Sequence, residues 1–333
     1  MEPPLPFHLP PVIHNASGET RKAGFELEYT GVSIAHSAQL VRDVFGGDHQ
    51  VDSTFEHQIH TPAGKFQCEI DTSFLKDKRY EKALETFGIE LEDDNRQKLE
   101  SMLLGVASTV VPIEIGTPPI PITELAPLDE LTRRLRRAGA KGTRASLLYA
   151  FGMHINPEIP TDDPAVLRDF LRAFVLLYPW LKNQSEVDVS RSISPYIKAF
   201  PNEYVRLILQ PDYPASRARL IDDYIAHNAT RNRPLDMLPV LAFLDKQRVM
   251  DRVEDPHLVK PRGAFHYRLP NCMVDEPQWT LAEEWNRWVA VERLAYDPER
   301  MAEMSREYER AEEQSFRPFY EKWPNVLEQY MRA

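Results

Sequence analysis

Carboxylates and histidines recur at alternate positions in several short segments whose apolar residues also alternate. Side chains at positions i and i+2 of a β-strand lie on the same face of that strand. One face of each predicted strand therefore carries these residues: Glu26 and Glu28; Gln67, Glu69 and Asp71; Glu114; Gly152, His154 and Asn156; and His266 and Arg268. Each segment alone is more typical of a solvated or structural strand than of a site, but their recurrence on successive strands favours a site.

Carboxylates gathered on one face repel one another unless cations neutralise them. A site for several Mg²⁺ or Mn²⁺ ions explains the pattern, because these hard ions bind oxygen ligands and substrate phosphates. Such a surface is a typical ATP site in a chain that has no phosphate-binding loop. The sequence contains neither Gly-x-x-x-x-Gly-Lys-Ser/Thr nor Gly-x-Gly-x-x-Gly, and neither His-Glu-x-x-His nor Gly-x-Ser-x-Gly.

Periodicity and turn residues predict the elements that position these side chains. The predicted strands are 24–32, a hairpin with arms 54–60 and 65–71 around a turn at 61–64, 110–115, 147–156 and 264–270. Helices are predicted between Ser33 or Ser37 and Gly46, over most of 79–108, at 128–138 and 164–184, through most of 190–260, and over 278–331. In the last of these segments, Trp279, Trp285, Trp288 and Leu294 mark an apolar stripe.

Composition excludes several classes of function. The chain has 333 residues and a formal net charge of −11, which argues against a nucleic-acid partner because phosphate contacts supply most of that affinity. Two cysteines without a Cys-x-x-Cys spacing make no disulfide framework. No apolar stretch approaches the ~18 residues that a membrane span needs, and we expect a soluble cytoplasmic protein without a membrane partner.

Five segments, in order, resemble motifs of the amidoligases, relatives of glutamine synthetase and glutamate–cysteine ligase. Segment 24–29, Gly-Phe-Glu-Leu-Glu-Tyr, resembles the first strand of that family. Segments 69–73, 112–119, 151–156 and 265–269 resemble its later motifs, so the resemblance covers most of residues 20–300. His266 departs from the pattern, because the family usually has a glutamate two residues before the arginine.

The resemblance implies an α+β fold, with a glutamine synthetase-like, curved, mainly antiparallel sheet packed with helices and a carboxylate-lined concave face. It implies an amidoligase domain at 21–300. Prolines predict an extended lead-in at 1–20, and 301–333 is predicted to be a C-terminal helical extension in which no motif of the family is found. The implied reaction uses ATP and Mg²⁺ (or Mn²⁺) to phosphorylate a carboxylate, and an amine then attacks the acyl phosphate. The partners would be small-molecule or peptide acids and amines, and a homo-oligomer is compatible with such enzymes.

The same resemblance suggests roles for single residues. Glu26, Glu114 and either Glu69 or Asp71 would bind metal near the acceptor substrate. Glu28 and His154 would bind the metal near the ATP phosphates, so that His154 also contacts the cofactor. Arg268 would contact ATP and stabilise the transferring phosphoryl group, and Asn156 would position substrate. The predicted catalytic residues are Arg268, Glu28 and Asn156.

Other interpretations stay open at the level of sequence. The same architecture serves phosphotransferases that act on a guanidino-type nitrogen, and His266 is also what a catalytically weakened scaffold or binding relative would show. A metal hydrolase without nucleotide is a further alternative. A run of basic residues is interpreted as a solvated helix face, or else as an electrostatic funnel for ATP; it comprises Arg133, Arg134, Arg136, Arg137, Lys141 and Arg144.

Overall fold

The computed structural model describes residues 5–70, 112–143, 152–185 and 197–313, together with Trp323 and Leu327. The predicted helix at 79–108, the predicted metal ligand Asp71 and the basic residue Arg144 lie outside these ranges. Among the helices within them, none is both long and apolar enough to cross a membrane.

The described strands form one open sheet of nine strands, in which every pair is antiparallel. The strand order is β2-β3-β4-β5-β1-β7-β9-β8, and β6 pairs with the start of β1. The bounds are β1 Lys22–Tyr29, β2 Asp48–Ser53, β3 Glu56–Thr61, β4 Gly64–Ile70, β5 Ile113–Gly116, β6 Ile120–Pro121, β7 Met153–Pro157, β8 Leu235–Asp236 and β9 His266–Tyr267. The predicted α+β class with a mainly antiparallel sheet is confirmed.

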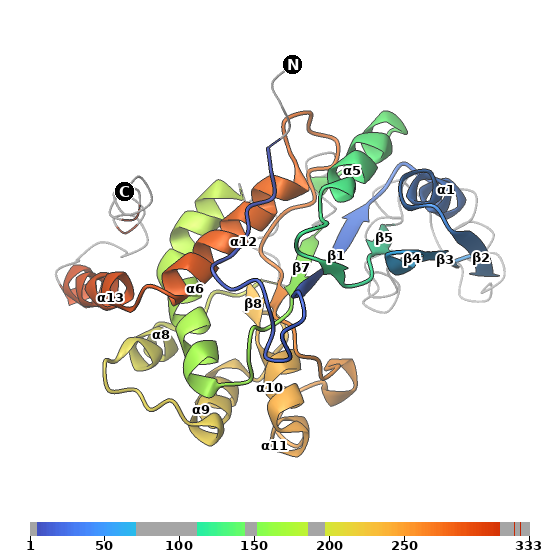
Figure 1. Ribbon diagram of the computed structural model, residues 1–333. Coiled ribbons are helices and arrows are strands. Elements are labelled where there is room, and N and C mark those ends of the chain that lie inside the picture. Colours follow the sequence, from blue (N-terminus) through green and yellow to red (C-terminus); the bar gives the residue numbers. More distant parts are fainter. Residues whose placement is uncertain are drawn as a thin grey trace, which may run out of the picture.

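Helices pack beside the sheet, with α6 and α12 lying side by side and α1 next to β3 and β4 (Figure 1). Their bounds are α1 Ile34–Phe45, α5 Pro127–Arg137, α6 Pro164–Gln184, α8 Asn202–Leu209, α9 Arg217–Asn228, α10 Leu238–Leu244, α11 Lys246–Met250, α12 Leu281–Ala295 and α13 Pro298–Glu313. Side-chain caps define several starts, because an N-cap oxygen satisfies an otherwise unpaired backbone N–H. These caps are Ser33, Asp163, Ser216 and Thr280.

The apolar face of the sheet packs against the helices. The ring of Phe25 in β1 lies 6.3 Å from that of Trp285 in α12, and Tyr267 in β9 lies 5.6 Å from Trp288. Both tryptophans are fully buried, which confirms the apolar stripe predicted for this helix. Because alternate residues point to opposite faces, the glutamates of β1 lie on the other face of the sheet.

The structure differs from the prediction at three strands. Strand β2 precedes the predicted hairpin, and the two-residue strand β8 lies in a region predicted to be helical. The strand predicted at 264–270 is reduced to the two paired residues of β9, flanked by isolated bridges. The helices predicted within 278–331 correspond to α12 and α13, which are separated between Ala295 and Pro298 because proline readily begins a helix but does not continue one.

The basic run of α5 is only partly a solvated face. Arg133 and Arg134 pair with Glu130 at the surface, as that interpretation expects. Arg136 is different, because its guanidinium donates to three backbone carbonyls of the segment before α12. These acceptors are Val274, Pro277 and Trp279. The interpretation is therefore wrong for Arg136, which links α5 to that segment.

Candidate metal-binding and active site

The strand register aligns four carboxylates in a row across the polar face. Glu28 in β1 lies opposite Glu114 in β5, and Glu114 lies opposite Glu69 in β4. Glu69 in turn lies opposite Glu56 in β3. Directly opposed residues of antiparallel strands have Cβ atoms roughly 5 Å apart. The fold therefore brings the predicted ligands Glu28, Glu69 and Glu114 together, and it adds Glu56, which the sequence analysis missed.

A second row on the same face centres on Glu26. In register, Glu26 lies between Gly116 of β5 and His154 of β7. Its Oε2 lies 2.7 Å from Nδ1 of His154, and its Oε1 accepts a 2.9 Å hydrogen bond from Nδ2 of Asn156. The Oδ1 of Asn156 accepts a 2.6 Å hydrogen bond from Nη2 of Arg262. The predicted residues Glu26, His154 and Asn156 thus form one connected network.

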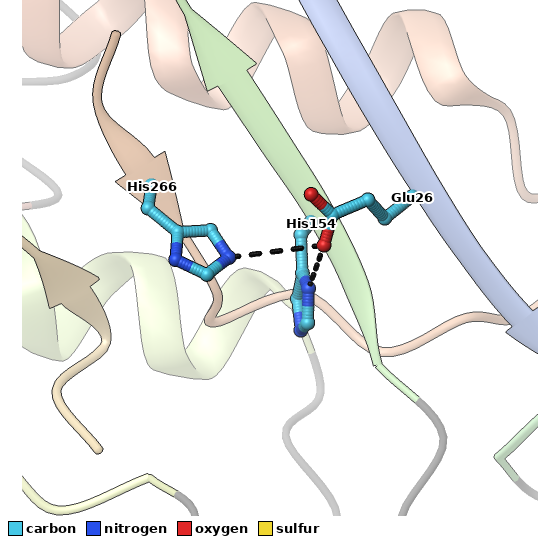
Figure 2. A group of neighbouring side chains, drawn as sticks. All are labelled: Glu26, His154 and His266. Carbon is cyan, nitrogen blue, oxygen red and sulfur yellow. Dashed lines mark hydrogen bonds and ion pairs between the residues drawn. The ribbon is translucent and has the colours of Figure 1, made fainter. Parts of the chain in front are cut away.

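His266 joins this network from β9. Its Nε2 lies 3.8 Å from Oε2 of Glu26, and its Nδ1 lies 3.3 Å from Oδ2 of Asp236, its register partner in β8. Figure 2 shows the two imidazoles directed toward the Glu26 carboxylate from neighbouring strands. One donor atom each from Glu26, His154 and His266 lies within 4.8 Å of the others.

Burial and hydrogen bonding set the protonation states of this group. Burial alone would raise the pKa of Glu26, but the hydrogen bond with His154 and the proximity of His266 outweigh it, and the pKa lies well below its ordinary value. Burial lowers the pKa of His154 to about 3, against the opposing effect of Glu26. At neutral pH an ionised Glu26 therefore accepts a hydrogen bond from the Nδ1–H of a neutral His154, which leaves a lone pair on Nε2.

Glu28 lies next to that second nitrogen of His154. Its Oε1 is 3.9 Å from Nε2 of His154, and its Oε2 accepts a 2.7 Å hydrogen bond from the backbone N–H of Gly152. Glu28 is therefore the residue at which the carboxylate row and the Glu26 network meet.

The donor atoms suit two kinds of metal ion. The row of Glu28, Glu69 and Glu114 offers only carboxylate oxygens, which fit the preference of Mg²⁺ for oxygen ligands. The group of Glu26, His154 and His266 offers two imidazoles and one carboxylate. Imidazole nitrogens suit transition metals and not Mg²⁺, so this second group does not fit Mg²⁺.

Arginines lie on the β8–β9 side of the network. Burial lowers the pKa of Arg231, Asp236 opposes this shift, and the charges of Arg268 and Arg262 lower the pKa further. Arg231 lies 3.7 Å from the Asp236 carboxylate. The positive charge of Arg268 also contributes to the low pKa of His154, after burial. The polar face therefore has a carboxylate-rich side and an arginine-containing side, and the predicted residue Arg268 lies on the latter.

Three residues of the site were not predicted from the sequence: Asp236, Arg231 and Gly116. Asp236 precedes the helix α10, and its Oδ1 accepts a hydrogen bond from the backbone N–H of Leu238, two residues further on. This is an ordinary role of an aspartate in a turn, so the residue type alone does not indicate a site. Gly116 directly follows a predicted strand, and glycine has no side-chain group that would identify it as a site residue. Only the pairing of distant segments shows what these residues contact.

Comparison with known proteins agrees with the motifs. The protein family described as "Putative amidoligase enzyme" matches residues 19–290. This range contains each of the residues that the sequence predicts to bind metal, ATP or substrate. Neither a curated protein nor a solved structure matches the chain. Because the family match spans most of the 333 residues, the chain belongs to the family of putative amidoligase enzymes.

Proposed function

We propose that this protein is an ATP-dependent ligase that joins a carboxylic acid to an amine through an acyl phosphate. The observation that carries the proposal is the carboxylate row of Glu28, Glu114 and Glu69, held in register across three neighbouring strands beside an arginine-containing edge. Membership of the amidoligase family supports the formation of an amide bond. ATP is the activating substrate in this proposal, because a carboxylate does not condense with an amine in water unless it is activated.

The proposed reaction has two steps. An oxygen of the substrate carboxylate attacks the γ-phosphorus of ATP, and ADP leaves. The amine then attacks the acyl carbon, and inorganic phosphate leaves with the electrons of the broken bond. Both steps move negative charge among phosphate oxygens, so charge neutralisation contributes more than covalent participation by the protein.

The residues divide this work between the two sides of the polar face. Glu28, Glu69 and Glu114 hold Mg²⁺, which neutralises the phosphate oxygens of ATP when it is bound. Arg268 contacts the γ-phosphoryl group and stabilises its charge during transfer. Asn156, fixed by Glu26 and Arg262, positions the carboxylate substrate through its amide. Arg262 supplies a planar pair of donors, the usual partner of a carboxylate.

Isothermal titration of the purified protein with Mg²⁺-ATP tests the nucleotide site. We expect binding that requires the metal and that weakens at least about tenfold in Glu28→Gln and Glu114→Gln, because each loses one charged oxygen ligand. Glu303→Gln is the matched control, since Glu303 is an exposed residue of α13 far along the chain from the site. A well-folded wild type that does not bind Mg²⁺-ATP would contradict the proposal.

A second experiment distinguishes ligation from related reactions. ADP release is measured with pools of acids and amines, offered separately and together, and products are identified by mass spectrometry. The ligase requires both an acid and an amine and forms an amide. ADP release that requires only a guanidino compound would instead indicate a phosphotransferase, and amide cleavage without ATP would indicate a hydrolase.

A further inference from the structure

His266 is a buried imidazole that is hydrogen-bonded at only one of its two nitrogens. The residue is 3% exposed, and its Nδ1 faces Asp236 at 3.3 Å. Its Nε2 is buried and has no hydrogen-bond partner among the described residues; the nearest carboxylate oxygen, Oε2 of Glu26, lies 3.8 Å away. That separation is too long for a hydrogen bond. A buried polar atom without a hydrogen-bond partner is uncommon in proteins, and a bound ion is one of the partners that would satisfy it.

Asp236 fixes the orientation of this imidazole. The Asp236 side chain is fully buried, and its other oxygen accepts a 3.0 Å hydrogen bond from the backbone N–H of Leu238. The carboxylate therefore cannot turn away from His266. When a carboxylate accepts a hydrogen bond from Nδ1–H of a neutral imidazole, the lone pair lies on Nε2, which faces Glu26. A carboxylate behind a histidine is the usual support of a histidine that binds a metal ion.

We propose that Glu26, His154 and His266 bind a first-row divalent transition-metal ion in preference to Mg²⁺, with Asp236 as the positioning residue of His266. The donor set of two imidazoles and one carboxylate, with one donor atom from each within 4.8 Å, is typical of ions such as Mn²⁺, Fe²⁺, Co²⁺ and Zn²⁺. The role of this ion in catalysis rests on the proposed function, whereas its binding does not.

This proposal gives the polar face two metal positions of different chemistry. The carboxylate row of Glu28, Glu69 and Glu114 has only oxygen donors, whereas the group at His266 has mainly nitrogen donors. The histidine at position 266, where the family usually has a glutamate, would then change the metal preference of this site. A structural imidazole that only bridges Asp236 and Glu26 would give no such preference.

Metal titrations without nucleotide test the proposal. The full chain is freed of metal and titrated with Co²⁺, followed by calorimetry and by the visible absorption of the bound ion, and then with Mg²⁺. We expect one Co²⁺ ion to bind at this group at least about tenfold more tightly than Mg²⁺. His266→Gln should weaken Co²⁺ binding at least tenfold, and His266→Glu should shift the ratio of the two affinities toward Mg²⁺.

Asp236→Asn tests the positioning role separately. Loss of the supporting carboxylate should weaken Co²⁺ binding by about 10–100-fold while His266 itself is retained. A matched control is His49→Gln, because Nε2 of His49 lies 3.0 Å from Nδ1 of His57 and this second imidazole pair is nearer the surface. The control variant should bind Co²⁺ at the His266 group as the wild type does.

Three results would overturn the proposal: wild-type affinity in folded His266→Gln, loss of Co²⁺ binding in His49→Gln alone, or no preference for Co²⁺ over Mg²⁺. If the variants do not fold, pulsed electron paramagnetic resonance of Mn²⁺ bound to the wild type decides. Modulation from imidazole nitrogen supports the proposal, and its absence overturns it.

The metal site and the ligase activity can fail separately. Co²⁺ binding through His266 without any ATP binding would contradict only the ligase. Mg²⁺-ATP binding without a His266-dependent ion would contradict only the metal site proposed here.

Discussion

Glu26 uses both of its carboxylate oxygens within the site. One oxygen contacts His154 and the other accepts from Asn156, while His266 lies close by. A carboxylate taken out of water is costly unless hydrogen bonds replace the lost solvation. The interactions of Glu26 with His154 and His266 more than compensate for the lost solvation. The pKa of Glu26 therefore lies below its ordinary value despite burial.

The low pKa of Glu26 predicts a pH-dependent contribution to stability. A carboxyl whose pKa is lower in the folded state stabilises the fold above its unfolded pKa, here the ordinary value of 4.5, and this contribution is lost as the pH falls toward the folded pKa. The free energy of unfolding of metal-free protein should therefore fall more steeply below pH 4.5 in the wild type than in Glu26→Gln.

Urea denaturation in the presence of a chelator, at pH values of about 6 and about 3.5, measures this difference. The exposed residue Glu303 provides the control, because Glu303→Gln should leave the pH dependence of the wild type unchanged. Parallel pH dependences for wild type and Glu26→Gln would show that Glu26 is not held in its ionised form by its neighbours.

At the scale of elements, Gly116 leaves space within the second row of the site. It lies between Gln67 of β4 and Glu26 of β1 in the register. A Cβ added at this position meets no described atom within 4 Å, and the backbone there is not in the left-handed region that favours glycine. Glycine is therefore not needed here for the backbone conformation of the strand. Its lack of a side chain instead leaves space for a ligand to reach the polar face.

A series of substitutions at Gly116 tests this interpretation. Alanine, valine and leucine should weaken Mg²⁺-ATP binding progressively as the side chain grows, because each fills more of the space beside Glu26. The free energy of unfolding should stay within about 0.5 kcal/mol of the wild type, since the substitution creates no clash with the described residues. Calorimetric titration and urea denaturation of the same samples measure both quantities. Equal binding across the series would place the ligand elsewhere.

The polar face could be predicted from sequence because the alternation of apolar and polar residues shows which face of a strand is buried. β1, β4 and β5 are buried on one face only, so their outward residues could be identified without knowing which strands are neighbours. The register could not be predicted, because the position of β5 between β4 and β1 depends on the pairing of distant segments. For the same reason the sequence did not indicate that Glu28 shares a row with Glu114 while Glu26 faces His154.

The strands β8 and β9 show the limit of periodicity. Each has two paired residues. Periodicity predicted a strand around β9, but two residues are too few to alternate in β8, where a helical region was predicted. Asp236 and His266 meet through this pairing, so their partnership could not be predicted from either segment alone. His266 was noted in the sequence as a departure from a family motif, whereas nothing in the sequence drew attention to Asp236.

At the scale of the whole molecule, Arg21 connects three parts of the chain. Its guanidinium forms a two-pronged ion pair with Glu292 of α12, at 2.7 and 2.8 Å, and donates to the backbone carbonyls of Val12 and Glu158. Both charged side chains are almost completely buried, and Trp288 donates a further hydrogen bond to Glu292. The N-terminal segment, the end of β7 and α12 are thus fixed to one another on the helix-covered side of the sheet.

Arg21→Met should destabilise the fold by about 3–5 kcal/mol, because it removes one partner of a buried ion pair and leaves the Glu292 carboxylate without its counter-charge. Arg133→Gln is the matched control, since its pair with Glu130 is about one-third exposed and should cost less than about 1 kcal/mol. Urea denaturation followed by tryptophan fluorescence and circular dichroism measures both. A loss below about 1 kcal/mol in Arg21→Met would mean that water enters and solvates Glu292. The N-terminal segment would then contribute little to holding the sheet against α12, and the position of β1 in the site would depend on the sheet alone.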